Sequence, residues 1–187
     1  MYGGDDADDS SGVLRHVRIE FTGFEITGDS PLPALALGGV GRGTEIENVH
    51  IHLPHGDGVH LFGGTARLRR VLVTGPEEDG FDVDEGWGGE AQFLAVQQHA
   101  DRADNGLEVD GTADLGGEAP NGAPVVSNVT LAGAPQSDAS DLGAILRAGA
   151  AGRFANVVVA GFAKACLDVD DVATWENAGR TTWRSSA

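Results

Sequence analysis

The 187 residues include 29 Asp and Glu against 12 Lys and Arg, which gives a net charge of −17 at pH 7. This excess of negative charge argues against a nucleic acid or direct insertion into an anionic membrane, because both attract positive surfaces. Hydrophobic residues make up 41% of the chain, which is too apolar for a disordered protein. A single cysteine, Cys166, excludes an internal disulfide framework. The composition therefore predicts an acidic globular domain.

The chain opens with an acidic stretch, residues 1–11, that contains four aspartates and is expected to form a solvated loop. This stretch lacks the basic and apolar regions of a signal peptide. From residue 14 onward a short pattern recurs: an apolar residue, two variable residues, a valine, one variable residue and another apolar residue. The residue before the valine is polar or turn-type in most copies, Ala95 being the exception. Copies spaced by 22 to 33 residues centre on Val17, Val49, Val71, Val96, Val129 and Val157.

A second pattern follows the first in each unit, after a turn that contains glycine. It is a run of four to six residues with alternating apolar side chains, which is typical of a strand. Residues 34–37 and 143–146 fit it more loosely. The clearest copies are Gly58–Phe62, Gly80–Asp84, Gly106–Asp110 and Cys166–Asp170.

Two strand patterns that recur in the same order predict an all-β solenoid, a right-handed parallel β-helix of about six coils. A β-sandwich is the main competitor, but antiparallel strands have no need to repeat both patterns in one order. We expect one β-helix domain over residues 1–187, with residues 172–187 as a C-terminal cap or tail. The best candidate for a helix is the segment 171–184.

Several stretches of the sequence resemble a family of exported bacterial surface proteins, often lipoproteins. The resemblance runs from about Tyr2 to Asp171. It implies a right-handed parallel β-helix with no assigned activity, a secreted or outer-membrane (cell-surface) location, and a natural N-terminal portion with an export signal. It brings no catalytic residues, and His60 stands where an acidic residue would be expected. The stretches that carry it are Gly12–Glu20, Gly38–Thr44, Asp57–Thr65, Asp79–Trp87 and Gly106–Asp110.

The second pattern places carboxylates on one outward face. Alternate residues of a strand face opposite sides, so Asp82, Asp84, Glu108 and Asp110 point outward if Phe81 and its equivalents point inward. Neighbouring strands lie about 4.8 Å apart and residues two apart lie about 6.6 Å apart, so the four carboxylates form a small rectangle. Opposed like charges destabilise a sheet. Splaying into water, raised pKa values or a bound cation must relieve the repulsion.

Three interpretations of this face remain open. The first is a solvated acidic surface. The second is a Ca²⁺ site, because Ca²⁺ takes about six to eight oxygen ligands and the adjoining turns add further carboxylates. The spacing is not that of an EF-hand. The candidate metal ligands are Asp79, Asp82, Asp84, Glu85, Glu108 and Asp110.

The third interpretation is a glycoside hydrolase or lyase that acts on a polysaccharide with the same carboxylates. Carboxyl pairs about 5–5.5 Å apart serve retaining hydrolysis and pairs about 6.5–9.5 Å apart serve inverting hydrolysis, and the rectangle comes near both. Three tryptophans and one tyrosine are few for a sugar-binding surface.

Histidines offer a different metal site. His50 and His52 share one strand face, with Glu20 expected beside His52, and three converging ligands would suit zinc or copper. Histidine on a solvated strand is more often only a polar surface residue, so metal binding here stays open. Five of the six histidines lie in the first third of the chain: His16, His50, His52, His55 and His60.

The sequence thus favours a non-catalytic secreted or surface domain that binds Ca²⁺, or a ligand through Ca²⁺, on its acidic face. The partner would be an extracellular glycan or another surface protein. A polysaccharide-active enzyme is the alternative. A structural fibre or stalk is a further one, since the open ends of a β-helix allow end-to-end self-association.

Overall fold

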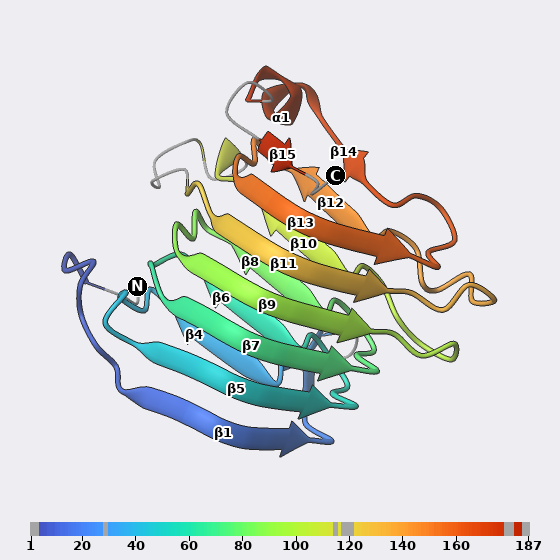
Figure 1. The fold of residues 1–187 in the computed structure, drawn as a ribbon, viewed down its shortest axis with the longest axis horizontal. Coiled ribbons are helices and arrows are strands. Elements are labelled where there is room, and N and C mark those ends of the chain that lie inside the picture. The colour runs from blue at the N-terminus through green and yellow to red at the C-terminus, as the bar shows by residue number, and fades with distance from the viewer. Residues whose placement is uncertain (1–3, 28–29, 114–115, 117–121, 178–181, 185–187) are drawn as a thin grey trace.

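The structure is a computed structural model that describes residues 4–27, 30–113, 116, 122–177 and 182–184. Over these residues the chain winds as a parallel β-helix of about six coils, as predicted (Figure 1). Each full coil contributes one long strand to a seven-stranded sheet and one short strand to a six-stranded sheet. No helix of the described residues is long and apolar enough to cross a membrane.

The seven-stranded sheet is parallel throughout and contains the first repeated pattern. Its full strands are eight residues long. In spatial order the seven strands are β1 (Val13–Glu20), β5 (Glu45–His52), β7 (Arg67–Thr74), β9 (Glu90–Gln97), β11 (Val125–Ala132), β13 (Arg153–Ala160) and the short β15 (Thr182–Arg184).

The six-stranded sheet is also parallel and contains the second pattern. Its strands stack in the order of the coils. They are β4 (Leu35–Gly38), β6 (Val59–Phe62), β8 (Phe81–Asp84), β10 (Leu107–Asp110), β12 (Ala144–Arg147) and β14 (Asp168–Val169).

The core lies between the two sheets and consists of apolar columns. In the six-stranded sheet Val59 pairs with Phe81 and Phe81 with Leu107, and all three side chains are buried. The inward orientation expected for this pattern is therefore confirmed in the central coils. The last coil packs less tightly, because Leu167 lies outside β14 with 40% of its surface exposed.

The inward-facing apolar residues of the first pattern are spaced by three residues and then by two. This spacing is uneven because one residue of each strand adopts a left-handed conformation. This residue has φ between 54° and 60° in every full strand of the seven-stranded sheet. Asparagine tolerates this conformation better than other non-glycine residues do. The six residues are His16, Asn48, Arg70, Phe93, Asn128 and Asn156.

In the fourth coil the structure corrects the predicted register. Leu94 pairs with Val71, and Val96 pairs with Val73, so Leu94 and not Val96 continues the valine column. Phe93 therefore takes the left-handed position. Ala95 does not precede the valine-column residue of this coil, so it is not an exception to the pattern. The small Ala91 fills the first apolar position of β9 and hides the pattern in the sequence.

Two further elements interrupt the coils. The two-stranded antiparallel hairpin of β2 (Glu25–Thr27) and β3 (Ser30–Pro31) lies between β1 and β4. Near the C-terminus α1 (Val172–Glu176) is capped by Asp171, whose side chain accepts a hydrogen bond from Thr174 N. The helix expected over residues 171–184 is thus limited to one short turn, because residues 182–184 pair with β13 as a strand.

Candidate metal-binding groove

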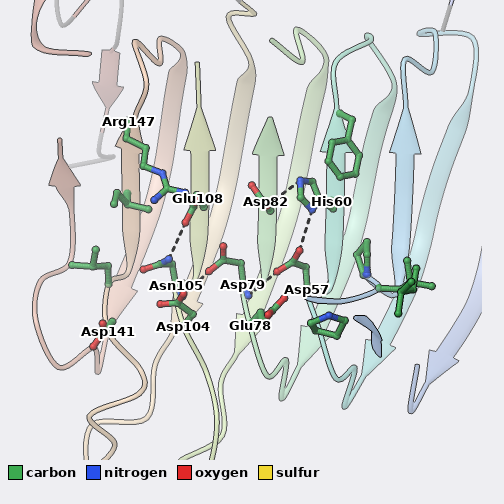
Figure 2. A pocket seen from close by; sticks show the side chains of 17 residues that line it. Asp57, His60, Glu78, Asp79, Asp82, Asp104, Asn105, Glu108, Asp141 and Arg147 are labelled. Carbon is green, nitrogen blue, oxygen red and sulfur yellow. Dashed lines mark hydrogen bonds and ion pairs between the residues drawn. The ribbon is translucent and has the colours of Figure 1, made fainter. Parts of the chain in front are cut away.

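A groove of about 660 Å³ runs over the six-stranded sheet and the turns that lead into its strands (Figure 2). One wall is apolar and comes from the segment around the β2–β3 hairpin: Ile26, Pro31, Leu32 and Pro33. The charged residues that line it are seven carboxyl groups and two cations. They are Asp57, Glu78, Asp79, Asp82, Asp104, Glu108 and Asp141 with His60 and Arg147.

Asp57, Asp79 and Asn105 form a buried ladder along the turns. Asp79 N donates to Asp57 Oδ1 at 3.0 Å, and Asn105 N donates to Asp79 Oδ1 at 2.8 Å. A glycine follows each of the three because the coils approach closely here. A Cβ on Gly80 would lie 2.5 Å from a methyl of Val96. The ladder therefore fixes two carboxyl groups at the floor of the groove.

The outward carboxylates of the sheet meet this ladder. Asp82 pairs with Glu108 in the parallel register, as the sequence predicts. Asn105 Nδ2 donates to Glu108 Oε2 at 3.0 Å and holds the carboxylate toward the turns. As a result, Asp79, Asp82 and Glu108 each offer an oxygen within 4.8 Å of the other two.

Crowding and burial disfavour negative charge at this point. Burial, and then the charges of Glu108 and Asp57, raise the pKa of Asp79 well above its ordinary value. Burial raises the pKa of Glu108 to about 7, although Arg147 acts in the opposite direction. Burial also raises the pKa of Glu78 to about 7, with the neighbouring charges of Asp57 and Asp104 adding to the effect. The groove thus concentrates carboxyl groups that lack sufficient countercharge.

His60 supplies one of the two cations in the groove. Its Nδ1 lies 3.1 Å from Asp57 Oδ2, and its Nε2 lies 2.9 Å from Asp82 Oδ2 and 3.9 Å from Asp84 Oδ2. Burial opposes the charged imidazole, but the three carboxylates raise its pKa to about 11. The ring also stacks on Phe62, with centroids 3.7 Å apart.

Arg147 is the other cation, and the two repeated sequence patterns did not predict it on this face. It extends from the end of β12, forms an ion pair with Glu108, and its Nε lies 2.8 Å from Asp110 Oδ1. The register places it directly beside Asp110. The signal was present, because extending the loosely fitting segment 143–146 by one residue reaches Arg147.

The six predicted metal ligands separate into three places. Asp79, Asp82 and Glu108 meet in the groove. Asp84 and Asp110 lie one step further along their strands, where His60 lowers the pKa of Asp84 and Arg147 contacts Asp110. Glu85 follows β8 and lines a different hollow, together with several glycines.

The early histidines do not gather at one point in the described structure. His16 is exposed on β1, and His55 contacts Glu25 and Glu77, which raise its pKa. His50 and His52 both contact Thr74 on the outer face of the seven-stranded sheet. Of the five, only His60 belongs to a group of three metal-type ligands in the described part of the chain, with Asp57 and Asp82.

Comparison with known families gives one finding. A family model described as a pectate-lyase-like β-helix domain matches residues 1–185, nearly the whole chain. Searches among curated proteins and among solved structures return no match. The family match agrees with the β-helix that the resemblance implied. The expectation of an exported surface protein still stands on that resemblance alone.

Proposed function

This chain belongs to the pectate-lyase-like β-helix family, and we propose that it is a non-catalytic binding domain whose groove takes up Ca²⁺. Through this ion it would hold an extended glycan. The observation that carries the proposal is the meeting of Asp79, Asp82 and Glu108, whose oxygens lie within 4.8 Å of one another.

The donor set suits a hard cation. Ca²⁺ prefers carboxylate and carbonyl oxygens and tolerates irregular geometry. Three carboxylates offer up to six oxygens, and the remaining positions would be open to water or to a ligand. Glu78 and Asp104 line the same groove and add carboxyl groups to it. Among the described residues, neither of the two forms an ion pair.

Electrostatics supports the same conclusion. Seven carboxyl groups against two cations leave a strongly negative groove, which would repel an acidic polysaccharide on its own. A divalent ion would neutralise part of this charge and could bridge the groove to oxygen atoms of a glycan. The apolar wall, which includes Ile26 and Leu32, would then face the carbon-bound hydrogens of the sugar rings.

A thermal melt in EDTA and in excess Ca²⁺ tests the proposal. Saturation at about 100 times the dissociation constant stabilises a protein by about 2.7 kcal/mol, which corresponds to a Tm rise of about 5–10 °C for this size. Glu108→Gln and Asp79→Asn should lose most of this rise. Asp168→Asn is the matched control, because it removes an exposed carboxylate further along the same column. Equal melts in EDTA and Ca²⁺ would refute Ca²⁺ binding.

One observation favours a second candidate, a polysaccharide-active enzyme. Asp79 and Glu108 each offer a carboxyl oxygen within 4.8 Å of the other, and burial raises the pKa of Glu108 to about 7. A carboxyl group with such a pKa can exchange protons near neutral pH.

The two candidates differ in their products. An enzyme would release reducing ends or unsaturated sugars from a glycan, and Glu108→Gln would abolish the release. The binding domain would retain the glycan on a column in Ca²⁺, release it in EDTA, and leave its length unchanged.

A further inference from the structure

The outer face of the seven-stranded sheet is not covered by any described part of the chain. This sheet faces the viewer in Figure 1, and no other labelled element crosses in front of it. No outward side chain on its six full strands is buried. The face is therefore open to a partner. Of the twelve large apolar side chains exposed among the described residues, five lie on it: Val13, Leu72, Phe93, Val125 and Val158.

The same face has the opposite charge to the rest of the molecule. Its six full strands hold six arginines and four glutamates on the outer side, a net charge of +2, which leaves −19 of the total of −17 on the remaining residues. Two such acidic molecules repel each other wherever other surfaces meet, so this face is where they can approach with the least repulsion. The six arginines are Arg15, Arg18, Arg67, Arg69, Arg70 and Arg153.

Arginine and an aromatic ring lie at the middle of the face. The Cζ atoms of Arg69 and Arg70 each lie 5.8 Å from the ring centroid of Phe93, which is 43% exposed. Arg69 forms no ion pair with another described residue, whereas Arg70 pairs with Glu47. Exposed arginine and aromatic side chains are the ones that contribute most to protein interfaces.

The size of the face suits a dimer. Eight residues of a strand span about 26 Å, and six neighbouring strands span about 29 Å, which gives an area of about 750 Å². A stable interface of standard size buries about 800 Å² on each partner. A second copy that presents the same face would cover this area completely.

We propose that this face binds the same face of a second copy, as two packed β-sheets, in a dimer whose twofold axis is parallel to the strands. This axis places β7 of one copy over β9 of its partner, and β1 over β13. Arg67, Arg69 and Arg70 then meet the partner's Glu90 and the partner's Phe93. A twofold axis across the strands would place β7 on β7 and oppose three arginines to three, which is unfavourable.

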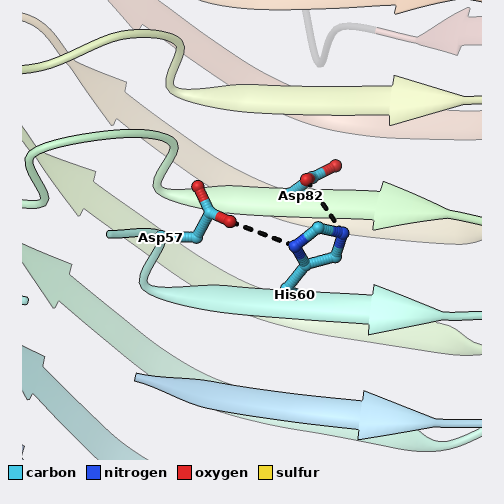
Figure 3. A group of neighbouring side chains, drawn as sticks. All are labelled: Asp57, His60 and Asp82. Atoms are coloured by element: carbon cyan, nitrogen blue, oxygen red, sulfur yellow. Dashed lines mark hydrogen bonds and ion pairs between the residues drawn. The ribbon is translucent and has the colours of Figure 1, made fainter. Parts of the chain in front are cut away.

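The contact closes on itself and leaves the groove free. Both copies use the same surface, so association stops at two chains. End-to-end stacking into a fibre would not stop there. His60 and Asp82 lie on β6 and β8, on the side of the molecule away from the seven-stranded sheet (Figure 3). The dimer therefore presents two grooves that point away from each other.

Sedimentation equilibrium of the full chain, from micromolar to millimolar concentration, tests the proposal. EDTA is present throughout, so the result does not depend on the proposed Ca²⁺ site. We expect the mass to rise from that of one chain to that of two and no further. Arg69→Glu and Val158→Glu should each weaken association by at least about 10-fold, because each places a new negative charge within the interface.

A matched control makes the same change of charge elsewhere. Arg102→Glu replaces an exposed arginine outside the face and should leave the dimer intact. Circular dichroism establishes that each variant is folded, and Val158→Glu decides alone if Arg69→Glu does not fold. A wild-type chain that stays monomeric at millimolar concentration, a mass that grows beyond two chains, or a dimer that survives the folded face variants would overturn the proposal.

Discussion

Removal of Arg147 should destabilise the metal-free protein by an amount that depends on pH. Arg147 is the one cation in contact with Glu108 among the described residues, and Glu108 is buried. A hydrogen bond to a charged group contributes about 1.5–3 kcal/mol. The Arg147 side chain is 45% exposed, and solvent screens its charge, so we expect a loss of about 1–2 kcal/mol for Arg147→Ala at pH 8.

The loss should be smaller at pH 5. With a pKa raised to about 7, Glu108 is largely protonated at pH 5 and needs no cation, whereas at pH 8 it is ionised. Chemical denaturation in EDTA at both pH values measures the difference. Arg153→Ala is the control, because it removes an exposed arginine from β13, away from the groove. Equal losses at both pH values, or a gain in stability at pH 8, would contradict this assignment of the groove's charge balance.

Other predictions follow from the same geometry. The metal-free Tm should fall as pH rises from 5 to 9. The fold raises the pKa values of Glu78 and Glu108 from 4.5 to about 7. These two groups therefore stabilise the fold most at a pH below 4.5, and this contribution to stability is lost as the pH rises to about 7. His60, raised to about 11, loses its contribution above about 6.5. A flat Tm over this range would contradict both assignments. Asn105→Asp should lower stability at pH 8 by about 1–3 kcal/mol by adding a buried charge beside Asp79, with urea denaturation as the measurement and recovery at pH 5 as the check. Gly80→Ala should cost about 1–3 kcal/mol or prevent folding, because its Cβ would collide with the neighbouring coil. Normal stability by urea denaturation would refute that close approach.

The sequence predicted the coils and the carboxylate rectangle because both follow from alternation along strands. Once Phe81 and Leu107 point inward, Asp82 and Glu108 must lie side by side on the outer face. The polar or turn-type residue before the central valine was recognised in five coils, but in the fourth the structure has Phe93 and not Ala95 at that position.

The remainder depends on features that alternation does not describe. Arg147 lies one residue beyond segment 143–146, which fits the second pattern only loosely, so the sequence did not assign it a place beside Asp110. The apolar wall comes from the β2–β3 hairpin, which matches neither repeated pattern. The buried contacts of Asp57 with His60 depend on side-chain orientation within a turn, for which the sequence offered only the dipeptide Asp57–Gly58.

The central claim is that successive coils bring Asp79, Asp82 and Glu108 together to hold one divalent cation. Equilibrium dialysis of EDTA-treated protein against radioactive Ca²⁺ tests it most directly. The account predicts saturable uptake by the wild-type protein, nearly complete loss in Asp79→Asn and Glu108→Gln, and full retention in Asp168→Asn. Unsaturable uptake that declines equally in all three variants would show a diffuse acidic surface instead, and would contradict the account.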